Sequence, residues 1–432
     1  MVPTDDPTAT VRTFATRFVE QSFADAVALL TADGRELVVD SFPEEFQQGQ
    51  LDAEDALEQY WWGLYGQYGA FEDVREVTID GTDATVEFAF ENGTETATLE
   101  LDSEDDGIAG FSFSPEYEVP AYVDESAFAE RDVTVDAGDV TLGGILTVPE
   151  GTGPFPAVLL VHGAGIHDPD GTAGNSKILK DLAWGLASEG IATLRYEKRL
   201  AEHEVADEDY TLDTVVTDDA VAALSELAAA DAVDEDAVFV AGHSQGGMCA
   251  PRITARHGGV AGIVNLDGPA DPPLDPEDAD IIRYEFERDG DLDEEQTAQL
   301  EDDRETLRRI AAGDFEDDET LHGRPGTWHR SVNECTPAET ACDLGRPVFV
   351  AKTCRADEET QSELVEFMHN GFREWQAATL PDGSRVELYE SLDHYFQAGP
   401  TPTTMDSLYF GGNVEGEVVA DLVAWIRETQ PQ

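Results

Sequence analysis

Residues 237–250 read AVFVAGHSQGGMCA and carry the strongest signal for the fold of this chain. Its apolar run 237–241 is typical of a buried strand, and the residues from 245 onward have the spacing of a helix. Between them lies Gly242-His243-Ser244-Gln245-Gly246, which matches the pattern G-x-S-x-G. Between a strand and a helix, this pattern places the serine on a sharp turn above the edge of a sheet. Ser244 is therefore the candidate nucleophile.

Strands and helices alternate on both sides of this stretch. Strands are predicted at 133–135, 140–148, 157–161, 192–196, 237–241, 260–266, 347–351 and 385–390. Helices are predicted at 178–188, 212–229, 245–256, 364–378 and 417–428. A highly charged, helical insertion at 271–344 interrupts the alternation, and we interpret it as a lid. The pattern predicts an α/β domain over residues 131–432 with a doubly wound, mostly parallel sheet.

The other groups that acyl transfer requires follow further strands of the same sheet. His162-Gly163-Ala164-Gly165 follows the strand 157–161, where a backbone N–H can stabilise an oxyanion. We predict that the N–H groups of Ala164 and Gln245 form the oxyanion hole, because Gln245 begins a helix whose dipole favours negative charge. His394 follows the last strand, which is the position expected of the general base.

The first 115 residues have a different pattern and predict a separate α+β domain. Apolar residues at helical spacing over 11–30 predict a helix or a broken helix pair, and a second helix is predicted at 53–65. Strands are predicted at 85–90, 96–101 and 108–113, with a tight turn at Asn92-Gly93. Residues 116–130 are interpreted as a linker. A group of aromatic residues is interpreted as core, with a pocket lining as the alternative: Tyr60, Trp61, Trp62, Tyr65 and Tyr68.

The chain carries 25 basic and 93 acidic residues, which gives a net charge of −68. This charge argues against nucleic acid and anionic membranes as partners. Acidic residues occur in every segment, while the 41% of hydrophobic residues predicts a folded protein. Because molar salt screens self-repulsion, we interpret the charge as an adaptation to salt, and the composition resembles that of haloarchaeal proteins.

Targeting signals and metal motifs are not evident in the sequence. The start, MVPTDDPTAT, lacks the basic and apolar regions of a secretory signal, and no apolar run reaches about 18 residues, so we expect a cytoplasmic protein. The cysteines contain no C-x-x-C pattern and no histidine pair at ligand spacing, so we expect no metal and interpret them as buried or loop thiols. They are Cys249, Cys335, Cys342 and Cys354.

Four stretches carry a resemblance to a known family: GPFPAVLLVHGAG, NSKILKDLAWGLASEGIATLRYEKRL, VFVAGHSQGGMCAPRI and LYESLDHYF. They resemble the α/β-hydrolase superfamily, in particular its dienelactone-hydrolase and serine-aminopeptidase-like branch. The resemblance covers residues 11–426 and implies a Ser/acid/His hydrolase that acts on small-molecule esters, thioesters or amides without a cofactor. The N-terminal domain resembles the cone-shaped domains of the ketosteroid-isomerase type, which makes a homodimer reasonable.

The acid of this triad is open between two residues, and a site without a functional acid is the third alternative. The family places an aspartate after the penultimate strand, where this chain has Ala356 with Asp357 next to it. Asp267 follows the strand 260–266, where some lipases of the superfamily carry their acid. The physical requirement is a buried carboxylate that accepts a hydrogen bond from the histidine ring. We favour Asp267 over Asp357 and do not expect Asp393, which is adjacent to His394, to reach the ring.

Two functions are open at this point. The first is a serine hydrolase, most similar to a carboxylesterase, in which Ser244 attacks an acyl carbonyl and His394 takes the proton. The second is a ligand-binding or sensor protein on a hydrolase fold, which the altered acid loop suggests.

Two further groups of residues are candidates for contact with a substrate. In RYEKRL, residues 195–200, the basic side chains are interpreted equally as holding loops through ion pairs and as binding a substrate carboxylate: Arg195, Lys198 and Arg199. In the insertion, Trp328 and His329 are candidates for lining the acyl or leaving-group pocket.

Overall fold

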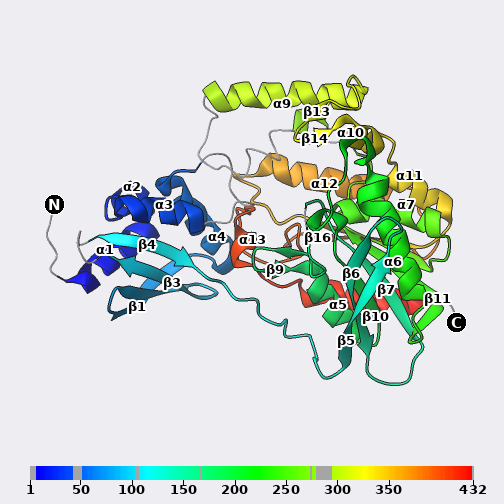
Figure 1. Cartoon of the computed structure of the whole chain (residues 1–432), viewed down its shortest axis with the longest axis horizontal. Coiled ribbons are helices and arrows are strands. Elements are labelled where there is room, and N and C mark those ends of the chain that lie inside the picture. Colours follow the sequence, from blue (N-terminus) through cyan, green and yellow to red (C-terminus); the bar gives the residue numbers. More distant parts are fainter. Residues whose placement is uncertain are drawn as a thin grey trace. The chain divides into compact units, whose positions relative to one another are not determined.

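The computed structural model describes residues 6–41, 51–102, 107–165, 167–272, 275–278 and 294–430. The chain divides into two compact units (Figure 1). The first comprises Met1–Glu118, Ala173–Ser176 and Gly399–Gly412, and the second comprises Val119–Thr172, Lys177–Ala398 and Asn413–Gln432. The first unit therefore includes two short segments from far along the chain, which the domain predicted over 1–115 does not contain.

The first unit combines helices with an antiparallel sheet. Its helices are α1 (Pro7–Val19), α2 (Phe23–Val27), α3 (Ala32–Ser41) and α4 (Ala53–Tyr68), and its strands pair in the order β1 (Phe71–Asp80), β2 (Asp83–Phe90), β3 (Gly93–Leu101) and β4 (Ile108–Phe113). The apolar stretch 11–30 forms two helices, as one of its two interpretations predicts. Sequence reasoning missed α3 and β1. Because β1 has no buried residue, it lacks the alternation that indicates a strand.

Aromatic side chains form the core of the first unit. Tyr60 and Trp61 of α4 are buried, and the ring centroid of Tyr60 lies 5.3 Å from that of Phe113 in β4. The segment Gly399–Gly412 contributes α13 (Ser407–Phe410), and the Tyr409 ring lies 5.8 Å from Tyr60. Tyr60 and Trp61 are thus core residues, while Trp62, Tyr65 and Tyr68 are half-buried.

An eight-stranded sheet forms the centre of the second unit (Figure 1). Its strands in spatial order are β16 (Arg385–Tyr389), β15 (Val348–Thr353), β12 (Gly262–Leu266), β11 (Val233–His243), β7 (Phe155–Val161), β10 (Ala192–Tyr196), β6 (Thr141–Pro149) and β5 (Phe128–Asp136). Strands from β16 to β10 are parallel to their neighbours, and β6 and β5 pair antiparallel. This is the doubly wound, mostly parallel sheet that the sequence predicts.

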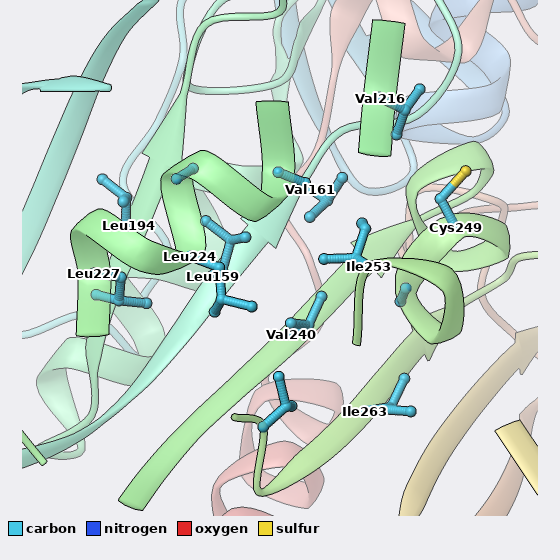
Figure 2. Packing of buried hydrophobic residues seen from close by; sticks show 14 of the residues in the cluster. Leu159, Val161, Leu194, Val216, Leu224, Leu227, Val240, Cys249, Ile253 and Ile263 are labelled. Carbon is cyan, nitrogen blue, oxygen red and sulfur yellow. The ribbon is translucent and has the colours of Figure 1, made fainter. Parts of the chain in front are cut away.

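Helices cover both faces of this sheet. In β7, Val158 and Leu160 pack with α5 (Ile178–Ser188) and α14 (Gly416–Thr429), while Leu159 and Val161 pack with α6 (Asp218–Ala228), α7 (Gln245–His257) and Trp375 of α12 (Ser362–Ala377). Figure 2 shows the second of these clusters, in which side chains of β7 and β11 face those of α6 and α7. Because both faces are buried, these strands are nearly continuous apolar runs, which is why the sequence predicts them well.

Two regions differ from the prediction. The strand β5 begins at Phe128, inside the stretch 116–130 that was interpreted as a linker. In the insertion, residues 273–274 and 279–293 lie outside the described residues, and the remainder contains α9 (Glu294–Ala312), α10 (Gly326–Asn333) and α11 (Pro337–Leu344). Trp328 of α10 and Ala341 of α11 belong to the same hydrophobic cluster as residues of α7, so this end of the insertion is part of the core.

Candidate active site

Ser244 lies on a sharp turn between β11 and α7. Its backbone has φ 52° and ψ −115°, a conformation that a residue with a side chain rarely adopts. A Cβ atom at Gly242 would lie 2.1 Å from the Gly246 backbone, and one at Gly246 would lie 2.5 Å from the Val161 carbonyl oxygen. Only glycine fits at these two positions, so the G-x-S-x-G spacing follows from the close packing of this turn.

The structure brings His394 and Asp267 together beside this turn. His394, in the loop after β16, donates from Nδ1 to Oδ2 of Asp267 at 2.5 Å, and Asp267 directly follows β12. The Ser244 N–H donates to the Leu266 carbonyl oxygen at 2.8 Å, so Ser244 and this carboxylate lie at adjacent strand ends. His243 donates from Nε2 to the His394 carbonyl oxygen at 2.8 Å. These bonds join the histidine loop, the acid and the serine turn.

The side chains of Ser244 and His394 are partly accessible to solvent. The His394 side chain is 38% exposed, and Ser244 is half-buried. Among the residues that the structure describes, the Ser244 hydroxyl makes no hydrogen bond. In serine hydrolases the hydrogen bond between nucleophile and base is frequently long before a substrate is bound, so this geometry is compatible with the predicted roles.

Two residues of β15 hold the Asp267 carboxylate. Lys352 Nζ lies 2.6 Å from Oδ1, and the Thr353 hydroxyl donates to Oδ2 at 3.0 Å. Burial by itself would raise the pKa of the Asp267 carboxyl, but the Lys352 ammonium and His394 outweigh that effect and hold this pKa below its usual value. Asp267 therefore stays ionised although it is almost fully buried.

Sequence reasoning missed Lys352 and Thr353. A signal was available, because Lys352 is one of only four lysines and directly follows the apolar run 347–351 at the carboxyl edge of the sheet. In the structure β15 continues through both residues, and its pairing of Ala351 with Leu266 places them beside Asp267.

The other two aspartates near the site shape loops. Asp357 accepts from the N–H groups of Glu359 at 3.0 Å and Thr360 at 2.8 Å, a turn within its own loop. Asp393 forms an ion pair with Arg355 at 3.0 Å and accepts from backbone N–H groups of the histidine loop. In the described part of the chain, Asp267 is the carboxylate that pairs with the His394 ring.

The loop after β7 passes close to Ser244. A Cβ atom at Gly163 would lie 3.3 Å from the Ser244 Cβ. Ala164 directly follows Gly163, and Gln245 directly follows Ser244, so the two predicted oxyanion donors lie at the junction of these segments. Gln245 also begins α7, and its N–H therefore has no acceptor within the helix.

Two neighbouring histidines are fully enclosed. Burial, together with smaller effects of Lys198 on His162 and of His394 on His243, lowers the pKa of both rings to about 3. The His162 ring donates to the Tyr196 carbonyl oxygen. These rings are neutral scaffolding, whereas the His394 ring is exposed and carries a carboxylate partner.

The arginines of RYEKRL have structural partners. Arg195 pairs with Glu130 at 2.6 Å and with Asp170 at 2.9 Å, and Arg199 pairs with Asp219 at 2.6 Å. All three pairs connect elements distant in sequence, which is the first of the two interpretations given above. Lys198 differs, because its Nζ donates to the neutral oxygen atoms of Gly163 and Gln245.

The remaining candidates are also held by the fold. Trp328 packs against Tyr210 with ring centroids 5.5 Å apart, and His329 donates from Nε2 to the Leu321 carbonyl oxygen at 2.8 Å.

The four cysteines are free thiols, and all except Cys342 are buried. Across the described ranges, no three His, Cys, Asp or Glu side chains are grouped as a metal site would need. Within those same ranges, every helix is too short or too polar to cross a lipid bilayer.

The sequence is similar to known hydrolases. The chain is 30% identical over 379 residues to Esterase EstD of Thermotoga maritima, which covers 86% of this chain and 87% of that protein. The chain is also similar to two solved structures: the carboxylesterase EstE1 from a metagenomic library (17% identity, TM-score 0.44, 72% and 92% of the two chains) and Est1E from Butyrivibrio proteoclasticus (17%, 0.43, 69% and 99%). Residues 158–402 match the Alpha/beta hydrolase family. That match spans more than half of the 432 residues, and the chain therefore belongs to the alpha/beta hydrolase family.

Proposed function

We propose that this chain is a serine hydrolase that cleaves carboxylic esters, with Ser244, His394 and Asp267 as its catalytic triad. The observation that carries the proposal is the 2.5 Å hydrogen bond between His394 Nδ1 and Asp267 Oδ2, at the strand end next to Ser244. This bond fixes the tautomer in which Nε2 is free to accept a proton. The 30% identity to Esterase EstD supports the same class of reaction.

The proposed reaction proceeds through an acyl-enzyme. Ser244 Oγ forms a bond to the acyl carbon while its proton moves to His394 Nε2, and the carbonyl electrons move onto the oxygen. The N–H groups of Ala164 and Gln245 stabilise this oxyanion. Collapse of the intermediate breaks the bond to the leaving alcohol, which takes the proton from His394. A water molecule repeats both steps on the acyl-enzyme, releases the acid and restores Ser244.

The proposed substrate is a small-molecule acyl compound. The partly exposed His394 leaves room for a leaving group, and thioesters and amides react by the same sequence of steps. Every step uses side chains, backbone N–H groups and water, so the proposal includes no cofactor.

We further propose that the protein works in a cytoplasm of molar salt. Its net charge of −68 is spread over the whole chain. At molar salt the screening length falls to about 3 Å, so the repulsion between these charges is weak. In this proposal nucleic acid and membranes are not partners. The first unit, with its helices α1 to α4 on an antiparallel sheet, is proposed to be a cone-shaped domain that mediates a homodimer.

A non-catalytic binding protein is the second candidate. It is favoured by one observation, that the Ser244 hydroxyl has no hydrogen-bond acceptor among the described residues. Such a protein would bind an ester without releasing its alcohol or acid.

A fluorophosphonate probe separates the two functions, because it labels only an activated serine at a useful rate. At molar salt we expect the wild type to be labelled at Ser244, the Ser244→Ala variant to stay unlabelled, and p-nitrophenyl acetate to be hydrolysed by the wild type alone. An unlabelled wild type that leaves the ester intact would refute the hydrolase proposal and support the binding protein.

A further inference from the structure

Lys198 is a buried cation beside the predicted oxyanion hole. It lies two residues after the end of β10 and is only 3% exposed. Its Nζ donates to the Gly163 carbonyl oxygen at 2.6 Å and to Oε1 of Gln245 at 3.2 Å. The ammonium group thus connects the loop after β7 with the first residue of α7, the two segments that meet at Ser244.

Lys198 differs from the other buried cations in its partners. Four other lysine or arginine side chains in the described part of the chain are buried, and each forms an ion pair with at least one carboxylate: Arg195, Arg199, Lys352 and Arg355. The contacts of Lys198 are both to neutral oxygen atoms.

Burying a charge without a counter-charge is costly, and 93 acidic residues were available to supply one. The cost of this unpaired charge calls for a reason. A positive charge at this position would stabilise the oxyanion that forms during the proposed acyl transfer.

The contact with Gly163 acts directly on the predicted donor. The Gly163 carbonyl and the Ala164 N–H belong to one peptide unit, and in a trans peptide these two groups point in opposite directions. By holding the carbonyl on one side, the ammonium fixes the direction of the N–H on the other. A charged donor on a carbonyl also polarises the amide and strengthens its N–H as a donor.

Further hydrogen bonds keep the loop in this orientation. The Lys198 N–H donates to the His167 carbonyl oxygen at 3.1 Å, and the His167 ring donates from Nε2 to the Ala164 carbonyl oxygen at 2.5 Å. The backbone and the side chain of Lys198 therefore hold both ends of the segment that contains the predicted donor.

We propose that Lys198 is a positioning residue of the oxyanion hole, whose ammonium group orients the Ala164 N–H and the Gln245 side chain and adds positive charge beside the oxyanion. The proposal rests on the proposed hydrolase function. It deepens that function by assigning transition-state stabilisation to a residue that does not touch the substrate.

The proposal implies a pH dependence of the acyl transfer. Burial, together with a smaller effect of the positive charge of Arg324 in β14 (Arg324–Pro325), lowers the pKa of Lys198 to about 7. The other titratable groups around it are neutral: the pKa of the His162 and His167 rings is lowered by burial, and that of the Cys249 thiol is raised by burial. The ammonium is present below pH 7 and is lost above it, so the rate constant should fall on the alkaline side.

Three variants test the proposal at molar salt with p-nitrophenyl acetate. Lys198→Met removes the charge, Lys198→Arg keeps a charge that does not titrate below pH 12, and Lys180→Met is a control on α5, where the half-buried Lys180 pairs with Asp170. For Lys198→Met we expect kcat to fall by about 10- to 100-fold with KM within about threefold, because removing one oxyanion donor costs about 10²–10³-fold. The control should keep wild-type kinetics.

The pH profile separates positioning from mere folding. We expect the alkaline loss of kcat in the wild type to be absent in Lys198→Arg. An alkaline loss that persists unchanged in Lys198→Arg, or a Lys198→Met variant with kcat within twofold of the wild type, would overturn the proposal. If Lys198→Met fails to fold, as measured by circular dichroism, the arginine profile decides alone. A wild type without turnover or fluorophosphonate labelling would instead refute the hydrolase function itself.

Discussion

Asp267→Asn keeps the shape of the side chain but gives it two chemically different ends. In the wild type one carboxylate oxygen accepts from His394 and the other binds the Lys352 ammonium. An asparagine can serve only one of these donors, since its NH2 group accepts no hydrogen bond. The buried ammonium has the stronger need for an acceptor, so we expect the amide oxygen to face Lys352. The NH2 group then faces His394, whose ring must accept at Nδ1 and carry its proton on Nε2, where it cannot take the Ser244 proton.

The expected loss in kcat is about 10⁴-fold, the value known for the equivalent change in a serine protease of another fold. It corresponds to about 5.4 kcal/mol in activation free energy. The free energy of unfolding should also fall, because Lys352 is left buried without a counter-charge, and breaking a buried ion pair costs about 3–5 kcal/mol.

Ester hydrolysis and fluorophosphonate labelling at molar salt measure the loss, and thermal melting followed by circular dichroism checks the fold. Asp357→Asn is the matched control, because Asp357 bonds within its own loop, and we expect it to stay within about threefold of the wild type. An Asp267→Asn variant that keeps more than about a tenth of wild-type kcat would refute the reasoning. If Asp357→Asn instead lost most of its kcat, the triad acid would be Asp357, next to the position that is usual in the family.

A second substitution distinguishes the tautomer from the charge. In the double variant Asp267→Asn with Lys352→Met, no ammonium competes for the amide oxygen, which is free to turn toward His394. The ring then regains the productive tautomer, although the negative charge is still missing. We expect kcat at least about tenfold above that of Asp267→Asn, together with part of the lost stability. A double variant no more active than the single one would show that the tautomer argument is wrong.

Three further predictions concern the nucleophile, the solvent and the serine turn. Ser244→Ala and His394→Ala should each lower kcat by about 10⁴-fold or more with the fold intact, because a triad acts as a unit; substantial activity in either would place the site elsewhere. The melting temperature should fall as salt decreases from molar to about 0.1 M, where the screening length grows to about 10 Å, and a flat melting temperature would contradict the salt adaptation. Gly246→Ala should destabilise the protein by about 3 kcal/mol or more, measured by denaturant unfolding, because its Cβ would meet the Val161 carbonyl oxygen at 2.5 Å.

The buried layers of the fold were the easiest part to predict. The strand β7 is buried on both faces, so its residues are apolar without interruption and the sequence predicts it clearly. The exposed strand β1 gives no such signal. The contribution of Gly399–Gly412 to the first unit was also unpredictable, because Tyr409 reaches Tyr60 by a contact that no local pattern encodes.

The choice of acid illustrates a second limit. With 93 acidic residues, the presence of an aspartate after a strand carries little information. What distinguishes Asp267 is the register of β12 with β15, which brings Lys352 and Thr353 to its carboxylate. The lysine was the rarer residue, so it was the better sequence signal for a functional carboxylate than any aspartate.

Backbone strain is concentrated at the candidate site. Of the five residues other than glycine with positive φ in the described part of the chain, Ser244, Asp267 and Phe396 lie on the serine turn, after β12 and in the histidine loop. Each is fixed by a hydrogen bond from its own N–H, to the carbonyl oxygens of Leu266, Ala351 and Asp393, respectively. Such conformations cost about 1–3 kcal/mol each and persist only where the surroundings determine them. Two of these bonds end on the strands β12 and β15, so the rigid sheet itself holds the serine and the acid in the strained geometry that the proposed reaction requires.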